Sequence, residues 1–137
     1  MGDNAALAAA FEEVLQTGDF AKVGALMQEH ATDDFIQDWP QSGERMNKEQ
    51  AIRIGEMYEA GSGTTPRFNY LRMIGGGDVF VVEGTVDYGD GTPVNYVGIG
   101  EIRDGKIARV TEYFANPFEA PEWRKGMTGR IEQPVTA

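Results

Sequence analysis

The second half of the chain consists of strand-like segments joined by very short turns, and this pattern restricts the fold more than any other feature. The turns contain glycine and aspartate, which suit tight reversals between neighbouring antiparallel strands. Parallel neighbours would need a crossover of about a dozen or more residues. The sequence therefore predicts a meander of four long strands over residues 68–74, 79–88, 94–103 and 107–114.

The first half of the chain has the spacing of amphipathic helices. Asp19 can cap one helix, and Gly18 suits the left-handed position that ends the helix before it. Helices that precede strands indicate an α+β fold rather than a parallel α/β fold. We expect three helices over residues 3–16, 19–28 and 47–59, with a strand over 33–39 and a polar turn over 41–44.

Composition and charge limit the partners that we expect. The chain has 137 residues, with 12 Lys and Arg against 22 Asp and Glu, and its formal net charge is -10. Such an acidic surface repels phosphate backbones and anionic lipids, so we expect no nucleic-acid partner and no membrane partner. There is no Cys and His30 is the only histidine, which argues against a zinc site or a Ser-His-Asp triad. We therefore expect no metal site and no cofactor.

The length of the chain fits one compact domain over residues 1–137. Within it, we expect an irregular tail over 116–137 whose aromatic residues form either a lid or a plain hydrophobic plug. The N-terminus lacks the basic flank and apolar core of a signal peptide. No apolar run approaches the roughly 20 residues needed to cross a bilayer, so we expect a cytoplasmic protein.

Glu112 places a charge where the surrounding pattern requires an apolar side chain. The segment from Ile107 to Phe114 follows an Asp-Gly turn and reads as a strand, so alternate residues share a face. Val110 and Phe114 flank Glu112 on its face. A carboxylate in such surroundings would be desolvated and should hold its proton unusually tightly. Enzymes use groups of this kind as acids or bases near neutral pH.

The even-numbered positions of the last three strands are expected to share one concave face beneath the helices. They are mostly apolar apart from Glu112, and Gly98 and Gly100 remove side-chain volume from the middle strand. Tyr96 adds an aromatic wall and a hydroxyl to this face. The odd-numbered face mixes charged and apolar residues, which suits a homodimer interface at least as well as water.

This arrangement resembles the nuclear transport factor 2-like (SnoaL-like) superfamily. The resemblance rests on Thr17–Phe20 between two helices, on Asp34–Arg45 after the second helix, and on Gly105–Phe114 near the end. It implies a cystatin-like cone, in which a curved, mixed and mostly antiparallel sheet wraps around three helices of the N-terminal half. This superfamily contains cyclases, isomerases, hydrolases, dehydratases and binding proteins, so the resemblance does not fix one activity.

The resemblance also suggests roles for single residues. Glu112 stands where SnoaL-like cyclases and limonene epoxide hydrolases carry a catalytic Asp. The epoxide hydrolases set that acid beside an Arg and a second Asp, where this chain has Gly84 and Val86, so that triad is incomplete. Asp38 stands where ketosteroid isomerases place their proton-transferring Asp, and Phe11 where they carry an oxyanion-stabilising Tyr. Phe has no donor, so steroid isomerisation by that mechanism is disfavoured.

Each candidate also has a purely structural interpretation. Glu112 could form an ion pair with Arg72 or Arg124, and Asp38 could cap the turn that follows it. Tyr96 could be an ordinary core tyrosine. If both carboxylates faced one apolar cavity instead, they would couple, so that one could act as the acid and the other as the base.

We therefore expect a pocket protein that binds a small apolar or oxygenated molecule. Glu112 and Asp38 are the expected catalytic pair for cyclisation, isomerisation, dehydration or epoxide hydration. The alternatives are a non-catalytic ligand binder and a dimeric scaffold whose cavity is filled by its own aromatic residues. The expected substrate-binding residues are Tyr96, Trp39, Phe11, Val86, Val110, Phe114, Phe118 and Trp123.

Overall fold

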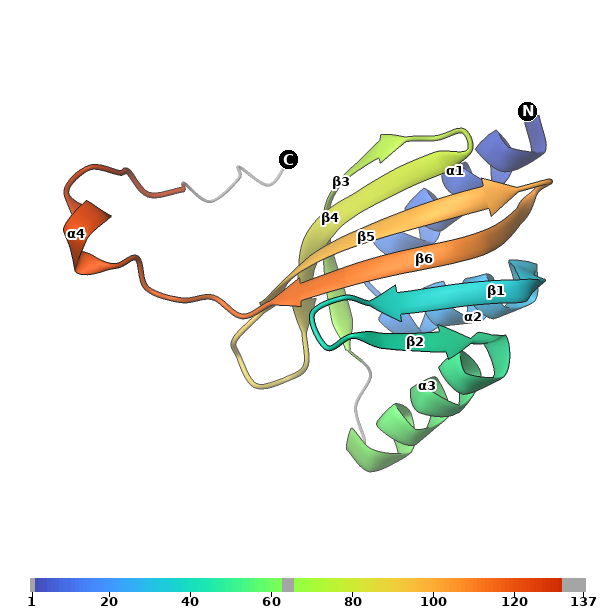
Figure 1. Ribbon diagram of the computed structural model, residues 1–137, viewed down its shortest axis with the longest axis horizontal. Helices are drawn as coiled ribbons and strands as arrows, with labels where there is room; N and C mark the ends of the chain where they lie inside the picture. Colours follow the sequence, from blue (N-terminus) through green and yellow to red (C-terminus); the bar gives the residue numbers. More distant parts are fainter. Residues whose placement is uncertain (1, 63–65, 132–137) are drawn as a thin grey trace.

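The computed structural model describes residues 2–62 and 66–131, which form helices and one sheet (Figure 1). The helices are α1 (Gly2–Gln16), α2 (Phe20–His30), α3 (Lys48–Ser62) and the short α4 (Glu122–Lys125). The strands are β1 (Ala31–Trp39), β2 (Glu44–Asn47), β3 (Arg67–Gly75), β4 (Val79–Asp87), β5 (Val94–Arg103) and β6 (Lys106–Ala115). Among the described helices, none is long and apolar enough to cross a membrane.

The six strands form one mixed sheet in the order β2-β1-β6-β5-β4-β3. The predicted meander is confirmed, because β3 to β6 pair with their sequence neighbours in antiparallel fashion. β1 lies parallel to β6, although the two strands are far apart in the sequence. The strand β2 was not predicted, since its segment was assigned to a polar turn and to the start of a helix. It pairs antiparallel with β1 and forms an edge of the sheet.

The helix boundaries follow from their capping residues. The Asp19 carboxylate accepts hydrogen bonds from the backbone of Ala21 and Lys22, which begins α2 as predicted. At the start of α3, the Asn47 side chain accepts from the Gln50 backbone, while the Gln50 side chain accepts from the Asn47 backbone. This reciprocal pair satisfies two backbone donors that a helix N-terminus otherwise leaves without a partner.

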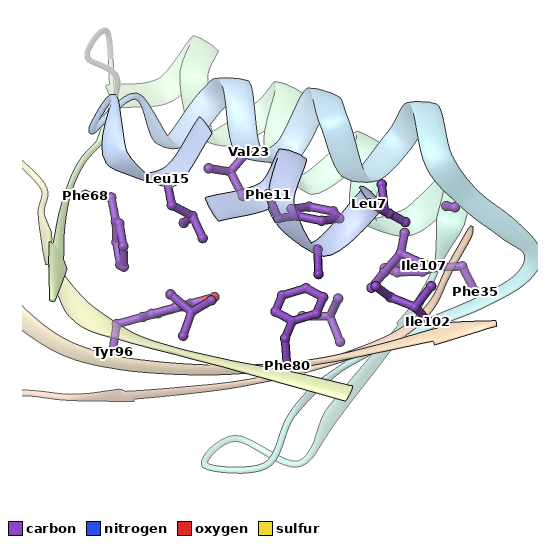
Figure 2. Packing of buried hydrophobic residues seen from close by; sticks show 14 of the residues in the cluster. Leu7, Phe11, Leu15, Val23, Phe35, Phe68, Phe80, Tyr96, Ile102 and Ile107 are labelled. Carbon is purple, nitrogen blue, oxygen red and sulfur yellow. The ribbon is translucent and has the colours of Figure 1, made fainter. Parts of the chain in front are cut away.

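The core lies between the helical layer and the concave face of the sheet (Figure 2). In Figure 2, Phe11 and Leu15 of α1 point toward the sheet, Phe80 points toward the helices, and Tyr96 lies along the inner face of the sheet. Even-numbered positions are buried from Phe80 to Val86 in β4 and from Tyr96 to Ile102 in β5, which confirms the predicted concave face. A register shift between Glu101 and Ile102 marks an irregularity in the pairing of β5 with β6.

Candidate functional site

A cavity of about 610 Å³ opens between α2, α3 and the end of the sheet formed by β1 and β2. Its wall is largely apolar, with Phe20 and Met27 from α2, Phe35 from β1, and Met46 from β2. Alternation along β1 explains the placement of Phe35, because residues 35, 37 and 39 share one face of the strand. Ligand sites of this size are usually apolar, with a few polar groups that orient the ligand.

Glu112 is one of those polar groups. It lies on β6 between two inward-facing neighbours, lines the cavity and is only 4% exposed. Its partner in the neighbouring strand is Gly98. A Cβ atom at Gly98 would collide with the hydroxyl of Tyr96, so glycine at this position lets the tyrosine ring lie across the strand. The tyrosine hydroxyl thereby reaches the Glu112 carboxylate.

Three neutral side chains donate hydrogen bonds to the Glu112 carboxylate. Gln37 Nε2 and Trp39 Nε1 donate to Oε1 at 2.6 and 2.9 Å, and the Tyr96 hydroxyl donates to Oε2 at 2.6 Å. Burial and the nearby Glu112 carboxylate raise the pKa of Tyr96 well above its usual value, so the tyrosine keeps its proton. An ionised carboxylate offers about four acceptor positions, and these contacts leave one on Oε2.

These contacts replace the ion pair with Arg72 or Arg124 that was one interpretation of Glu112. Arg72 instead donates to Glu83 on β4, at 2.6 Å. Arg124 lies in α4, where its guanidinium is 5.7 Å from the Trp123 ring.

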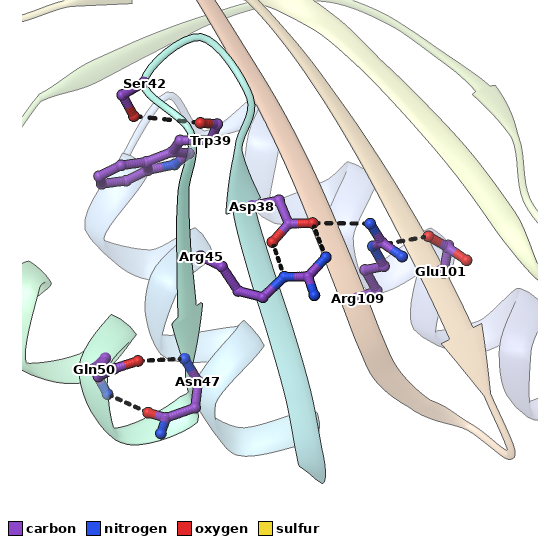
Figure 3. A network of polar contacts seen from close by, with 8 residues as sticks. All are labelled: Asp38, Trp39, Ser42, Arg45, Asn47, Gln50, Glu101 and Arg109. Atoms are coloured by element: carbon purple, nitrogen blue, oxygen red, sulfur yellow. Dashed lines mark hydrogen bonds and ion pairs between the residues drawn. The ribbon is translucent and has the colours of Figure 1, made fainter.

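Asp38 lies on the opposite face of the sheet (Figure 3). It pairs with Arg45 of β2 in the strand register, and the Arg45 Nε–Asp38 Oδ1 distance is 2.7 Å. Arg109 of β6 contacts the other oxygen at 2.8 Å and also lies 3.8 Å from Glu101. The hydrogen bond from Arg45 is the largest cause that lowers the pKa of Asp38. Burial opposes it, and the charge of Arg45 and the hydrogen bond from Arg109 lower the pKa further.

This placement corrects the expectation that Asp38 faces the cavity together with Glu112. Gln37 pairs with Val110 and Asp38 with Thr111, so the parallel register puts Gln37 on the inner face and Asp38 on the outer one. The two carboxylates therefore do not share a cavity and do not form an acid–base pair there. Nor does Asp38 act as a simple turn cap, because both of its oxygens are bound by arginines.

Of the other expected binding residues, Trp39 and Phe114 line the cavity. Their rings meet edge to face, with centroids 6.2 Å apart. Tyr96 reaches the site through its hydrogen bond to Glu112. The structure does not bring the remaining expected residues to the cavity wall. Phe11, Val86 and Val110 are buried in the adjoining hydrophobic core.

The aromatic residues of the C-terminal tail also lie outside the cavity. Phe118 is 82% exposed and Trp123 is 72% exposed. Figure 1 shows the tail leaving the end of β6 and extending away from the sheet, with α4 at a distance from the helices. In this structure, therefore, neither the lid nor the plug expected of these side chains is formed.

Sequence reasoning missed Gln37 and Lys48, two polar residues that line the cavity. A signal for Gln37 was present, because it interrupts the inward-facing apolar positions Phe35 and Trp39 just as Glu112 does on β6. Lys48 follows the unpredicted strand β2, so its position could not be inferred. Within residues 2–62 and 66–131, no group of three His, Cys, Asp or Glu residues is arranged to hold a metal ion.

Several solved structures share this fold. An NTF-2 like protein of unknown function from Burkholderia xenovorans is 28% identical, with a TM-score of 0.71 over 94% of this chain and 98% of its own. A proposed ketosteroid isomerase from Kribbella flavida is 20% identical, with a TM-score of 0.76 over 100% of this chain and 96% of its own. IdmH from Streptomyces antibioticus, a proposed polyketide cyclase, is 14% identical, with a TM-score of 0.58 over 81% of this chain and 91% of its own.

No curated protein sequence matched the chain. The model of the SnoaL-like domain family, however, matches residues 8–110, which include most of α1, all of α2 and most of the sheet. The helices, the six-stranded mixed sheet and the similar solved structures agree with this match. The chain therefore belongs to the SnoaL-like domain family of the nuclear transport factor 2-like superfamily.

Proposed function

We propose that the cavity binds a small, mostly apolar, oxygenated molecule and that Glu112 transfers a proton to or from this molecule. The observation that carries the proposal is a buried carboxylate at the wall of an otherwise apolar cavity of about 610 Å³. Carboxylates in apolar surroundings serve as acids or bases when a reacting group lies within hydrogen-bonding distance.

The hydrogen bonds of Glu112 suit such a role. The remaining acceptor position on Oε2 is the one that would receive a proton from a bound molecule. Tyr96 donates to the same oxygen, and Gln37 and Trp39 hold the other. These donors would fix the orientation of the carboxylate and limit its motion as the substrate approaches. A carboxylate held in this way acts on one region of the substrate.

The reaction class follows from what one carboxylate can do. Isomerising a ketosteroid and cyclising a polyketide both require removal of a proton from a carbon next to a carbonyl group, and two similar structures are proposed to act in these ways. In the proposed reaction, Glu112 takes that proton, the electron pair moves onto the carbonyl oxygen, and the proton returns to the rearranged product. Dehydration and epoxide hydration remain within the same acid–base chemistry.

A second candidate function is non-catalytic binding of the same kind of molecule. It is favoured by the three donors on Glu112, because they occupy most of the acceptor positions of the carboxylate and leave one for a bound molecule. In that case Glu112 would only orient the ligand, by accepting a hydrogen bond from one of its hydroxyl groups.

Replacing Glu112 by Gln separates these two functions. Activity would be measured across pH on steroid, terpenoid and polyketide-like ketones, and binding of the same compounds would be measured by calorimetry. Catalysis by Glu112 predicts that E112Q retains binding but loses at least about a hundredfold in kcat, together with the ionisation seen in the wild-type pH profile.

Glu83→Gln is the matched control, because Glu83 is a strand carboxylate whose partner Arg72 lies away from the cavity. If the activity of E112Q depended on pH in the same way as that of the wild type, Glu112 would be excluded as the acid or base. Ligand binding without turnover of any compound by the wild type would favour the non-catalytic function.

We also infer that the outer face of the sheet pairs with a second copy of the chain. Ile74, Val81, Ile99 and Thr111 pair in succession across β3 to β6, and Val97 pairs with Tyr113 beside them. Ile74 and Tyr113 are exposed in the isolated chain. A contiguous apolar surface of this kind on a sheet is typical of a protein–protein interface. Most soluble oligomers are homo-oligomers, and a twofold interface brings the same patch of both subunits together, so a second copy related by twofold symmetry is the partner that we propose.

A further inference from the structure

We propose that Lys48 binds a carboxylate group of the ligand, at the end of the cavity opposite Glu112. The inference rests on the function proposed above. It restricts the expected ligand to an apolar molecule that carries an oxygen-containing group at one end and a carboxylate at the other. The structural basis is a cation in the wall of an apolar cavity.

Lys48 is the first residue of α3 and lines the cavity. Its Nζ donates to the backbone carbonyl of Ala31 at 3.5 Å, a long contact with another lining residue. An ammonium group has three donors, so at least two remain for a ligand. Other cations of the fold, such as Arg45 and Arg103, form ion pairs with Asp38 and Asp34, respectively, at 2.7 and 2.6 Å. Between Lys48 and the carboxylates of residues 3–57 and 66–131, no ion pair is formed.

The acidic residues of the wall do not neutralise Lys48. Glu56 lies eight positions further along α3, which separates the two backbones by about 12 Å. Glu112 is bound by its own donors. Lys48 is the one cation among the described lining residues, so a ligand with a single negative charge would be matched by it. A phosphate carries more charge and is usually met by several donors or by an arginine fork, which this wall does not supply.

The strand register sets the distance between the two ends of the ligand. Asn47 pairs with Ile36 of β1, so the backbone of Lys48 stands near the level of Phe35, while Trp39 marks the level of the Glu112 carboxylate. Four residues along a strand span about 13 Å, and the Lys48 side chain extends beyond Phe35 to the carbonyl of Ala31. A ligand that reaches both groups therefore has a rigid or extended apolar body of at least about this length, as several fused rings with a short acidic side chain would have.

Lithocholic acid and its methyl ester test the proposal, because both carry a hydroxyl at one end of a fused-ring body and only the acid carries a charge at the other. Calorimetric titration of the wild type should give an affinity for the acid about tenfold to a hundredfold higher than for the ester. Lys48→Met should bind the acid more weakly and so lose the preference for the acid over the ester. Lys48→Arg should retain most of this preference.

Lys22→Met is the matched control, because Lys22 is an exposed lysine of α2 outside the cavity wall. It should bind the acid as the wild type does. Equal binding of acid and ester by the wild type would overturn the role of Lys48 and leave the proposed function intact. If the wild type bound neither compound, both the role of Lys48 and the proposed function would be contradicted. Thermal unfolding of each variant serves to check that it is folded.

Discussion

At the scale of single residues, three polar side chains occupy positions that face the interior: Gln37, Tyr96 and Glu112. Buried polar groups are stable only when they are hydrogen-bonded, and here they satisfy one another within one cluster. The alternation of each strand identified Glu112 and Tyr96 as inward-facing. That the two groups meet depends on the register of β5 against β6, where Gly98 pairs with Glu112.

Tyr96→Phe should lower the free energy of unfolding by about 1–3 kcal/mol, because it leaves a buried carboxylate without one of its donors. Urea denaturation followed by circular dichroism measures this change. Thr92→Val is the control: it removes a hydroxyl from an exposed residue of the turn between β4 and β5, and should change stability by less than about 0.5 kcal/mol. Equal effects of the two substitutions would show that the Tyr96–Glu112 hydrogen bond contributes nothing to stability.

At the scale of secondary-structure elements, the Asp38 cluster connects three strands on the outer face. Asp38 of β1 is held by Arg45 of β2 and Arg109 of β6, so edge and central strands are linked by charge as well as by backbone pairing. Asp38 was expected to face the cavity because its segment resembles that of ketosteroid isomerases. The face of a strand changes with a shift of one residue, and only the pairing partners decide it.

Stability should depend on pH through Asp38. Its pKa is lower in the folded chain than the unfolded value near 3.9, so its contribution is complete above about pH 4 and is lost as pH falls through the lowered pKa. The difference in free energy of unfolding between wild type and Asp38→Asn should therefore be constant from pH 7 to pH 5 and should shrink below pH 4.

The control for this measurement combines Asp38→Asn with Arg45→Met. The difference in free energy of unfolding between Arg45→Met and this double variant should depend less on pH, because Arg45 is the largest cause of the lowered pKa of Asp38. If the difference between wild type and Asp38→Asn grew as the pH was lowered, the pKa of Asp38 would not be lowered in the folded chain. Denaturant titrations at each pH provide the free energies of unfolding.

At the scale of the whole molecule, the helices cover one face of the sheet and leave the other face open (Figure 1). The helical layer buries the concave side, and the cavity lies where α2 and α3 meet β1 and β2. The outer face carries the apolar positions assigned above to a second copy of the chain. The tail leaves β6 close to Phe114 of the cavity wall, but its large side chains remain exposed.

Ile99→Glu should convert a dimer into a monomer, because it puts a charge in the centre of the proposed interface, opposite Val81 of β4 and Thr111 of β6. Sedimentation equilibrium of the wild type should give twice the mass of the chain, and the variant should give the mass of one chain. Met57→Glu is the control, since Met57 is an exposed apolar residue of α3 away from the sheet. A wild type that is monomeric at high concentration would disprove the interface.

The local elements were predictable because their signals are local. The caps at Asp19 and Asn47 and the Gly-containing turns of the meander are each read within a few residues, and the structure confirms them. The strand β2 was missed because it is four residues long and has one buried residue, Met46, so its alternation is too short to recognise. Its edge position and its contact with β1 depend on a chain reversal after Trp39.

Periodicity and capping over short distances were enough to predict the α+β class, the order of the elements other than β2 and α4, and the inward direction of Glu112. Contacts between distant segments determine which residues meet Glu112, on which face Asp38 lies, and that Lys48 enters the cavity wall. These outcomes depend on the parallel pairing of β1 with β6 and the hairpin of β1 with β2. Side-chain packing across the whole sheet sets such registers, and no local stretch of sequence encodes them.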